Sequence, residues 1–198
     1  MQETNSRLHP KGFNMNRARI PLLTLTVMIS LLLAPVTARA QKGYALGIGG
    51  GAAIPVGKLG DVQKTGYSAL LALALGSPDL PIGLRFDGIY NNLTHTDLPT
   101  GTASADMRVA GAIVNVVYAF PGTYAKPYVL AGAGWYNSKV DSTDAKAQNN
   151  FGFNAGLGTT FGFGPAAAFL EARYHTISRS VEKGGVFQFV PITFGLMF

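Results

Sequence analysis

The chain has 198 residues, a formal net charge of +6 and no cysteine. Without cysteine, neither a disulfide framework nor a lipidated cysteine anchor can form after export. Glycine is frequent (25 residues) and no stretch keeps a helical hydrophobic period, which argues against a helical fold and favours β structure throughout.

Residues 1–40 have the features of a leader with a signal peptide. Two arginines, an apolar run and a small-x-small cleavage site follow one another: Arg17 and Arg19, Leu22 to Ala34, and Ala38-Arg39-Ala40. The apolar run is about 13 residues, short of the roughly 20 that a membrane-spanning helix needs. We therefore expect cleavage before Gln41, with Met15 as a possible true start.

The leader also accounts for most of the positive charge. It contains five of the 16 basic residues and one of the ten acidic residues, so the remaining chain has 11 basic and 9 acidic residues, or +2. A nucleic-acid-binding function therefore has no support from charge.

Residues 41–198 are enough for one domain and contain eight predicted strands. Most of the strands have ten or more residues, near the 9 to 11 that a tilted membrane-spanning strand requires. In chain order they are Gly43–Ala53, Gly66–Gly76, Ile82–Asn91, Met107–Ala119, Pro127–Asn137, Asn150–Phe163, Ala167–Ile177 and Val186–Phe198.

The connections between these strands alternate in length. Those after the second, fourth and sixth strands are short turns, whereas the other four are longer and polar: Ile54–Thr65, Asn92–Asp106, Ser138–Asn149 and Ser178–Gly185. This asymmetry is typical of a transmembrane barrel with periplasmic turns and external loops.

Several strands show which residues face inward. In the third strand Ile82, Leu84 and Phe86 alternate with Arg85 and Asp87, and in the seventh Leu170, Ala172 and Tyr174 alternate with Glu171, Arg173 and His175. The charged set must face inward if the other set meets lipid. The sixth strand places Phe151 and Phe153 outward and small or polar residues inward, whereas the fifth strand is apolar on both faces, so its register stays open.

The last strand alternates up to the end of the chain. Val190, Ile192, Phe194, Leu196 and Phe198 share one face. We interpret Phe194, Leu196 and Phe198 as the C-terminal insertion signal of an outer-membrane barrel, with the eighth strand closing against the first.

Aromatic residues are expected in two bands at the membrane interfaces. Near the short turns these are Tyr44, Tyr118, Phe120, Tyr128, Phe161 and Phe198, and near the long loops Tyr67, Tyr90, Trp135, Phe151, Tyr174 and Phe187.

Arg85, Asp87, Glu171 and Arg173 are the main candidate site. The third and seventh strands of an eight-stranded barrel lie opposite each other, and such a lumen is narrow enough to be filled by side chains. We expect Arg85 to pair with Glu171 and Asp87 with Arg173, which would form a charge-neutral plug. In the alternative, these residues line a narrow water-filled channel.

Four glycine-rich stretches carry a family resemblance: Gly47–Gly57, Lys126–Gly134, Phe153–Gly158 and Phe189–Leu196. On their order and spacing the sequence resembles the small outer-membrane β-barrel family, which includes OmpX and the transmembrane domain of OmpA. The resemblance implies no shared catalytic set, because members of this family are adhesins, surface-shielding barrels, structural anchors or proteins of unassigned role. In the usual C-terminal signal of such proteins a glycine lies four residues before the final aromatic, whereas here Phe194 holds that position.

Two other functions need separate consideration. His175 and Ser178 invite comparison with outer-membrane lipid A deacylases, but their three-residue spacing places them on opposite faces of a regular strand. A secreted soluble barrel that holds a ligand would need an apolar lumen, which the four inward charges argue against. His95 has no partner of metal-ligand type nearby in the sequence and is expected to be a loop residue.

The sequence therefore predicts an all-β, eight-stranded, antiparallel up-and-down transmembrane barrel in the outer membrane of a diderm bacterium. It predicts a monomer without enzymatic activity, cofactor or metal, whose four external loops bind surface partners or shield the membrane. The expected partners are outer-membrane lipid and lipopolysaccharide, and the barrel-insertion machinery during biogenesis.

Overall fold

The computed structural model describes residues 43–77, 80–95, 105–141, 146–179 and 185–198. The predicted signal peptide lies outside these residues, as do parts of three of the predicted long loops.

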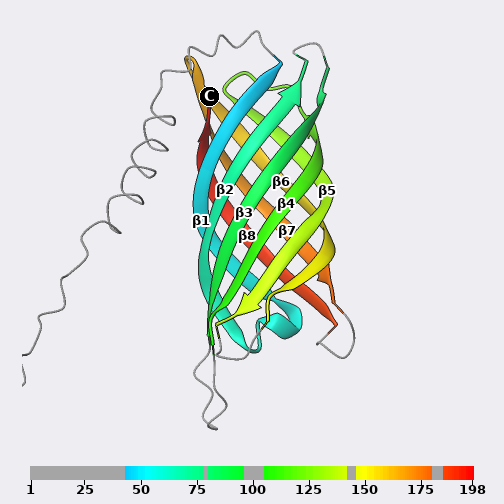
Figure 1. The fold of residues 1–198 in the computed structure, drawn as a ribbon. Coiled ribbons are helices and arrows are strands. Elements are labelled where there is room, and N and C mark those ends of the chain that lie inside the picture. The colour runs from blue at the N-terminus through cyan, green and yellow to red at the C-terminus, as the bar shows by residue number, and fades with distance from the viewer. Residues whose placement is uncertain (1–42, 78–79, 96–104, 142–145, 180–184) are drawn as a thin grey trace, which may run out of the picture. The chain divides into compact units, whose positions relative to one another are not determined.

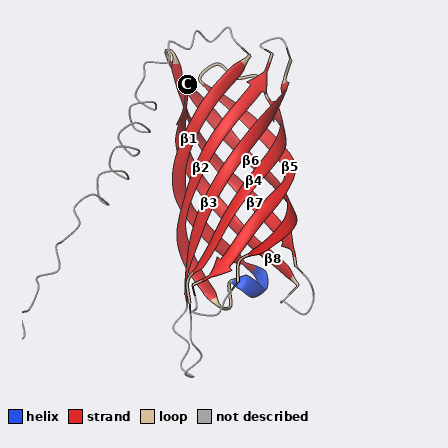
Figure 2. Cartoon of the chain, viewed as in Figure 1, coloured by secondary structure: helices blue, strands red, loops and turns tan. Residues whose placement is uncertain are grey.

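Eight antiparallel strands form a closed barrel in which each strand pairs with its neighbours in the sequence (Figures 1 and 2). β8 pairs with β1 and closes the sheet. The strands are β1 (Tyr44–Val56), β2 (Gln63–Gly76), β3 (Ile82–His95), β4 (Met107–Ala119), β5 (Ala125–Val140), β6 (Gln148–Phe163), β7 (Ala166–Ser178) and β8 (Val186–Met197). The predicted eight-stranded, up-and-down antiparallel barrel is confirmed.

Six of the eight strands extend further toward the long loops than the sequence predicts, and β4 and β8 begin where predicted. The expected loop Ile54–Thr65 is reduced to residues 57–62, because β1 continues to Val56 and β2 already starts at Gln63. This short connection contains the 3-10 turn η2 (Gly57–Leu59). At the start of β2, Gln63, Lys64 and Thr65 are polar and suggest a loop, but polar side chains do not prevent the backbone from continuing the hydrogen-bonded ladder. Within the described residues, no helix has the length and hydropathy needed to cross a membrane.

Apolar side chains lie on the outer face of the barrel, whereas polar and charged side chains lie inside it. On β3, Ile82, Leu84 and Phe86 are exposed, whereas Arg85 and Asp87 are buried. The expected faces of β6, β7 and β8 are also observed. An exposed apolar face around a buried polar interior is the pattern of a barrel surrounded by lipid.

β8 stays paired with β1 from Gln188 to the end of the chain. Phe194, Leu196 and Phe198 lie on the exposed face. The backbone N–H of Phe198 donates to Leu46 O at 2.8 Å, and the N–H of Leu46 donates to Phe198 O at 2.9 Å. Hydrogen bonding between the two terminal strands therefore continues to the final residue.

Two aromatic residues predicted to lie at the membrane interfaces face inward instead. Tyr128 on β5 is 6% exposed and Phe187 on β8 is 3% exposed, while the other ten predicted interface aromatics are exposed. For Tyr128 the prediction was wrong because both faces of β5 are apolar, so alternation did not determine its register. Phe187 was assigned by its height in the barrel alone, although it shares the inward face of β8 with Phe189.

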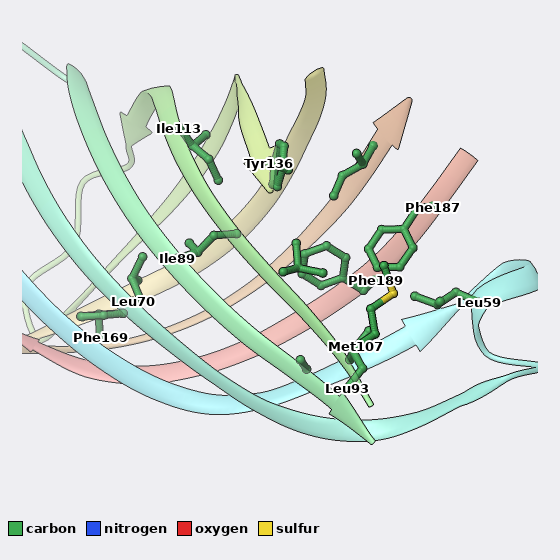
Figure 3. Close-up of a cluster of buried hydrophobic side chains, with 13 residues drawn as sticks. Leu59, Leu70, Ile89, Leu93, Met107, Ile113, Tyr136, Phe169, Phe187 and Phe189 are labelled. Atoms are coloured by element: carbon green, nitrogen blue, oxygen red, sulfur yellow. The ribbon is translucent and has the colours of Figure 1, made fainter. Parts of the chain in front are cut away.

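The lumen is apolar at the long-loop end. Buried Leu59, Leu93, Met107, Phe187 and Phe189 belong to one hydrophobic cluster, to which η2 contributes Leu59 (Figure 3). Together they form an apolar cap over the interior of the barrel.

Small residues on β1 and β8 leave room for one large inward side chain. Phe169 on β7 is 1% exposed. A Cβ at Gly49 or Gly195 would lie only 2.9 or 2.5 Å from its ring. The glycines at these two positions are therefore required by the close approach of the ring.

Candidate functional site in the barrel lumen

Two opposite strands position the four charged side chains. Arg85 and Asp87 are two residues apart on β3, and Glu171 and Arg173 are two residues apart on β7, so each pair shares the inward face. β3 and β7 are four strands apart in the closed sheet of eight. All four side chains are at most 4% exposed.

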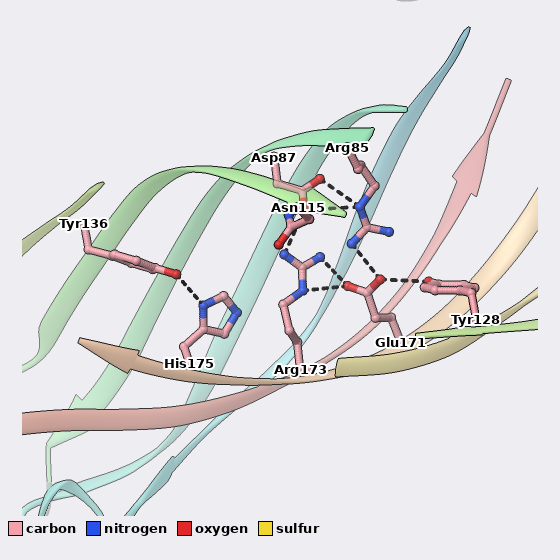
Figure 4. Close-up of polar contacts among 8 residues, drawn as sticks. All are labelled: Arg85, Asp87, Asn115, Tyr128, Tyr136, Glu171, Arg173 and His175. Atoms are coloured by element: carbon pink, nitrogen blue, oxygen red, sulfur yellow. Dashed lines mark hydrogen bonds and ion pairs between the residues drawn. The ribbon is translucent and has the colours of Figure 1, made fainter. Parts of the chain in front are cut away.

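The structure brings both predicted pairs together across the lumen (Figure 4). Arg85 Nη2 donates to Glu171 Oε2 at 2.7 Å, and Arg173 Nη1 donates to Asp87 Oδ2 at 2.8 Å. Each arginine also contacts the acid of its own strand: Arg85 Nε donates to Asp87 at 3.2 Å and Arg173 Nε to Glu171 at 3.0 Å. Each carboxylate therefore accepts hydrogen bonds from both guanidinium groups, in a closed network of four ions.

Two neutral side chains complete the network, and sequence reasoning assigned neither to it. Asn115 on β4 donates to Asp87 Oδ2 at 2.7 Å, and the Tyr128 hydroxyl on β5 donates to Glu171 Oε2 at 2.8 Å. Alternation could have identified Asn115, because it is the one polar residue in the otherwise apolar stretch 109–117 of β4. No pattern in β5 indicated Tyr128.

The composition of the network matters for its stability. Two arginines and two acids give the network a net charge of zero, so none of its four charges is left without a counter-ion. Removing a single ion from water into a protein interior costs several kcal/mol, which only close pairing and additional hydrogen bonds can offset. The contacts of Asn115 and Tyr128 supply such hydrogen bonds.

A second polar contact lies on the long-loop side of the four charges. The Tyr136 hydroxyl lies 2.9 Å from His175 Nδ1, and the His175 ring stacks on Phe189 with a centroid distance of 4.8 Å and an interplanar angle of 8° (Figure 4). His175 is fully buried in the lumen.

Ser178 lies on the opposite face of β7 from His175. Ser178 is exposed, and the pairing of β7 with β6 and with β8 keeps one register throughout, without a bulge. His175 and Ser178 therefore lack the shared face that a hydrolytic pair would need.

Residues 24–198 match the family described as the outer membrane protein beta-barrel domain. The chain belongs to this family. A search of curated proteins found no match.

Solved structures show the same fold as this outer-membrane barrel. One is the crystal structure of Neisserial surface protein A (NspA), with 17% identity over 79% of this chain and 96% of that chain and a TM-score of 0.59. Another is the crystal structure of Ail, the attachment invasion locus protein of Yersinia pestis, with 16% identity over 79% of this chain and 99% of that chain and a TM-score of 0.51.

At the long-loop end of the outer-membrane barrel, the prediction for His95 was wrong. His95 is the last residue of β3, and its Nδ1 lies 2.8 Å from Asp106 Oδ1, which also accepts the His95 backbone N–H at 3.1 Å. These hydrogen bonds hold the pKa of Asp106 below its ordinary value. The sequence did not indicate this contact, because His95 and Asp106 are 11 residues apart in the chain.

A second ion pair at this end joins Arg108 on β4 to Asp141, which directly follows β5. Unlike the lumen ions, both side chains are substantially exposed, at 45% and 35%. In the part of the chain that the structure describes, no group of three His, Cys, Asp or Glu residues could hold a metal ion.

Proposed function

We propose that the protein is an outer-membrane barrel of a diderm bacterium whose lumen does not conduct and whose function lies in its external loops. The four-ion network of the lumen carries this proposal. The short turns, the start of β1 and the end of β8 would face the periplasm, and the four longer connections would face the outside of the cell.

The inward side chains of β3 support a closed lumen along its length. From the short-turn end they are Arg85, Asp87, Ile89, Asn91 and Leu93, and all are buried. An ion that crossed this interior would have to separate Arg85 from Glu171 and then pass the apolar cap. Eight-stranded barrels are narrow enough for side chains to fill them, so this arrangement favours a plug over a channel.

If the lumen is plugged, the external loops are the part of the barrel that can interact with other molecules at the cell surface. The two solved relatives are named as a surface protein and an attachment protein, which describes those proteins. A surface-interaction role for the loops of this chain is in keeping with the same fold and with the absence of a shared catalytic set in the family it resembles. Its proposed role is therefore non-enzymatic.

Planar-bilayer recording tests the plug. The wild-type barrel should show no stable unitary conductance. The double variant Glu171→Ala/Arg173→Ala keeps the lumen neutral but removes half of the network, and it should produce small conductance steps. The matched control is Arg108→Ala/Asp141→Ala, which removes an exposed pair and should stay silent. Large, stable steps in the wild type would refute the plug and favour the narrow channel.

Cell fractionation tests the location. The folded barrel should partition with the outer membrane and should migrate differently on a gel before and after boiling. Recovery in the soluble periplasmic fraction would contradict the proposed location.

A further inference from the structure

The outward face of the barrel contains an apolar groove of about 640 Å³ that crosses β1 to β5. These strands lie on the near side of the barrel in Figure 1. Exposed side chains of Ile48, Leu71, Tyr90 and Trp135 line the groove, at 50%, 58%, 37% and 68% exposure. It lies in the half of the barrel nearer to the long loops, because Tyr90 and Trp135 belong to the aromatic band at that end.

The groove exists because small residues meet on neighbouring strands. Gly88 on β3 pairs with Ala112 on β4, and Tyr90 pairs with Ala110, so two alanines and a glycine lie where bulky side chains cover the rest of the surface. A Cβ at Gly88 would meet no atom within 4 Å. Its backbone φ lies outside the left-handed region, so a larger side chain could be accommodated there without strain.

Two cations lie just beyond the groove, on the side of the long loops. Arg108 and Lys139 are directly opposite each other on β4 and β5, on the same face as Ala110 and Trp135. Like charges in this arrangement destabilise a sheet. Asp141 pairs with Arg108, but no carboxylate among the described residues lies within ion-pair distance of Lys139. Asp141 therefore offsets the charge of Arg108, and among the described residues the charge of Lys139 is left without a counter-ion at this end of the barrel.

We propose that this groove and its two cations bind a phosphorylated lipid of the outer leaflet, of the lipid A type. Its acyl chain would lie along Leu71, Gly88 and Trp135, and its phosphate would contact Lys139 and Arg108. Charge complementarity selects a phosphorylated lipid over a neutral one, and the position near the long loops selects the outer leaflet. This orientation rests on the proposed function.

Trp135 gives a direct assay because it is the only tryptophan of the chain and lines the groove. Purified barrel in neutral detergent micelles is titrated with diphosphorylated lipid A while tryptophan emission is followed. We expect a saturable blue shift, and a weaker response to lipid A stripped of its phosphates. Phosphatidylcholine, which carries no net charge, should give no saturable shift.

Variants separate the phosphate contact from the groove. Lys139→Gln should weaken binding about fivefold, the typical contribution of one surface cation near anionic lipid. Lys126→Gln removes the same charge from the other end of β5 and should change nothing. Gly88→Leu should fill the groove and weaken binding more strongly, whereas Gly162→Leu, at a glycine with equal free space at the short-turn end of β6, should not.

Each result has a defined meaning. Equal affinity for diphosphorylated and phosphate-free lipid, or an unchanged affinity in Lys139→Gln, would overturn the phosphate contact. Binding that survives Gly88→Leu would overturn the groove. Heat-modifiability reports whether the barrel is folded, and bilayer recording reports whether its lumen conducts. A folded, non-conducting barrel that does not bind lipid A would refute this inference alone. A conducting barrel that binds lipid A would refute only the plug.

Discussion

Glu171→Gln is the most direct test of the lumen network. The substitution keeps the size and shape of the side chain but removes its charge. Arg85 and Arg173 would then share Asp87 as their only acid in the network, and the net charge of the network would change from zero to +1.

The expected cost follows from the contacts of this carboxylate. Glu171 accepts hydrogen bonds from Arg85 at 2.7 Å, Tyr128 at 2.8 Å and Arg173 at 3.0 Å. Glutamine keeps one acceptor oxygen and turns an N–H₂ group toward the guanidinium groups. Since a buried ion pair that loses one partner typically loses about 3–5 kcal/mol, we expect the free energy of unfolding to fall by about that amount.

Urea unfolding in lipid vesicles, followed by the unboiled gel band, measures this change. The double variant Glu171→Gln/Arg85→Gln restores neutrality and should cost less than the sum of the two single variants, with a coupling of about 0.5–3 kcal/mol. Asp141→Asn is the control, because it removes the acid of an exposed pair and should cost at most about 1 kcal/mol.

A loss below about 1 kcal/mol in Glu171→Gln, equal to that of the exposed control, would refute the reasoning. It would mean that water reaches the carboxylate well enough to replace its partners. Strict additivity in the double variant would likewise contradict direct coupling between Arg85 and Glu171.

Two further substitutions test the packing of the barrel and its long-loop end. Gly195→Ala would place a Cβ 2.5 Å from the Phe169 ring and 2.3 Å from a backbone oxygen, and we expect a destabilisation of about 1–3 kcal/mol in the same urea assay; a neutral result would show that the two strands separate easily there. The pKa of Asp106 is lowered in the folded state by its hydrogen bonds from His95, so its contribution to stability is present above the ordinary aspartate pKa of about 4 and is lost as the pH falls through the folded-state value. Amide exchange protection at the end of β3 and the start of β4, corrected for intrinsic rates, should therefore decrease between about pH 5 and pH 3 in the wild type but not in Asp106→Asn. Equal pH dependence in both proteins would contradict this assignment.

The sequence by itself determined the architecture, because alternation and connection length are local properties of the chain. The alternation within β3 alone defines its two faces, with Ile82, Leu84 and Phe86 on one and Arg85 and Asp87 on the other. The same reasoning placed Glu171 and Arg173 inward, and counting strands placed them opposite β3. Several predicted strands, such as β2 and β3, stopped too early at the long-loop end, because polar residues mark the end of the lipid layer and not the end of the hydrogen-bonded ladder.

Only the tertiary structure decided which side chains complete the network and where the surface is hollow. Tyr128 lies on a strand that is apolar on both faces, so its inward direction depends on the register that neighbouring strands impose. His95 and Asp106 meet because β3 and β4 pair beyond the expected strand end. The groove at Gly88 requires small residues from different strands to lie side by side, and this proximity is created by strand register and not by any local pattern in the sequence.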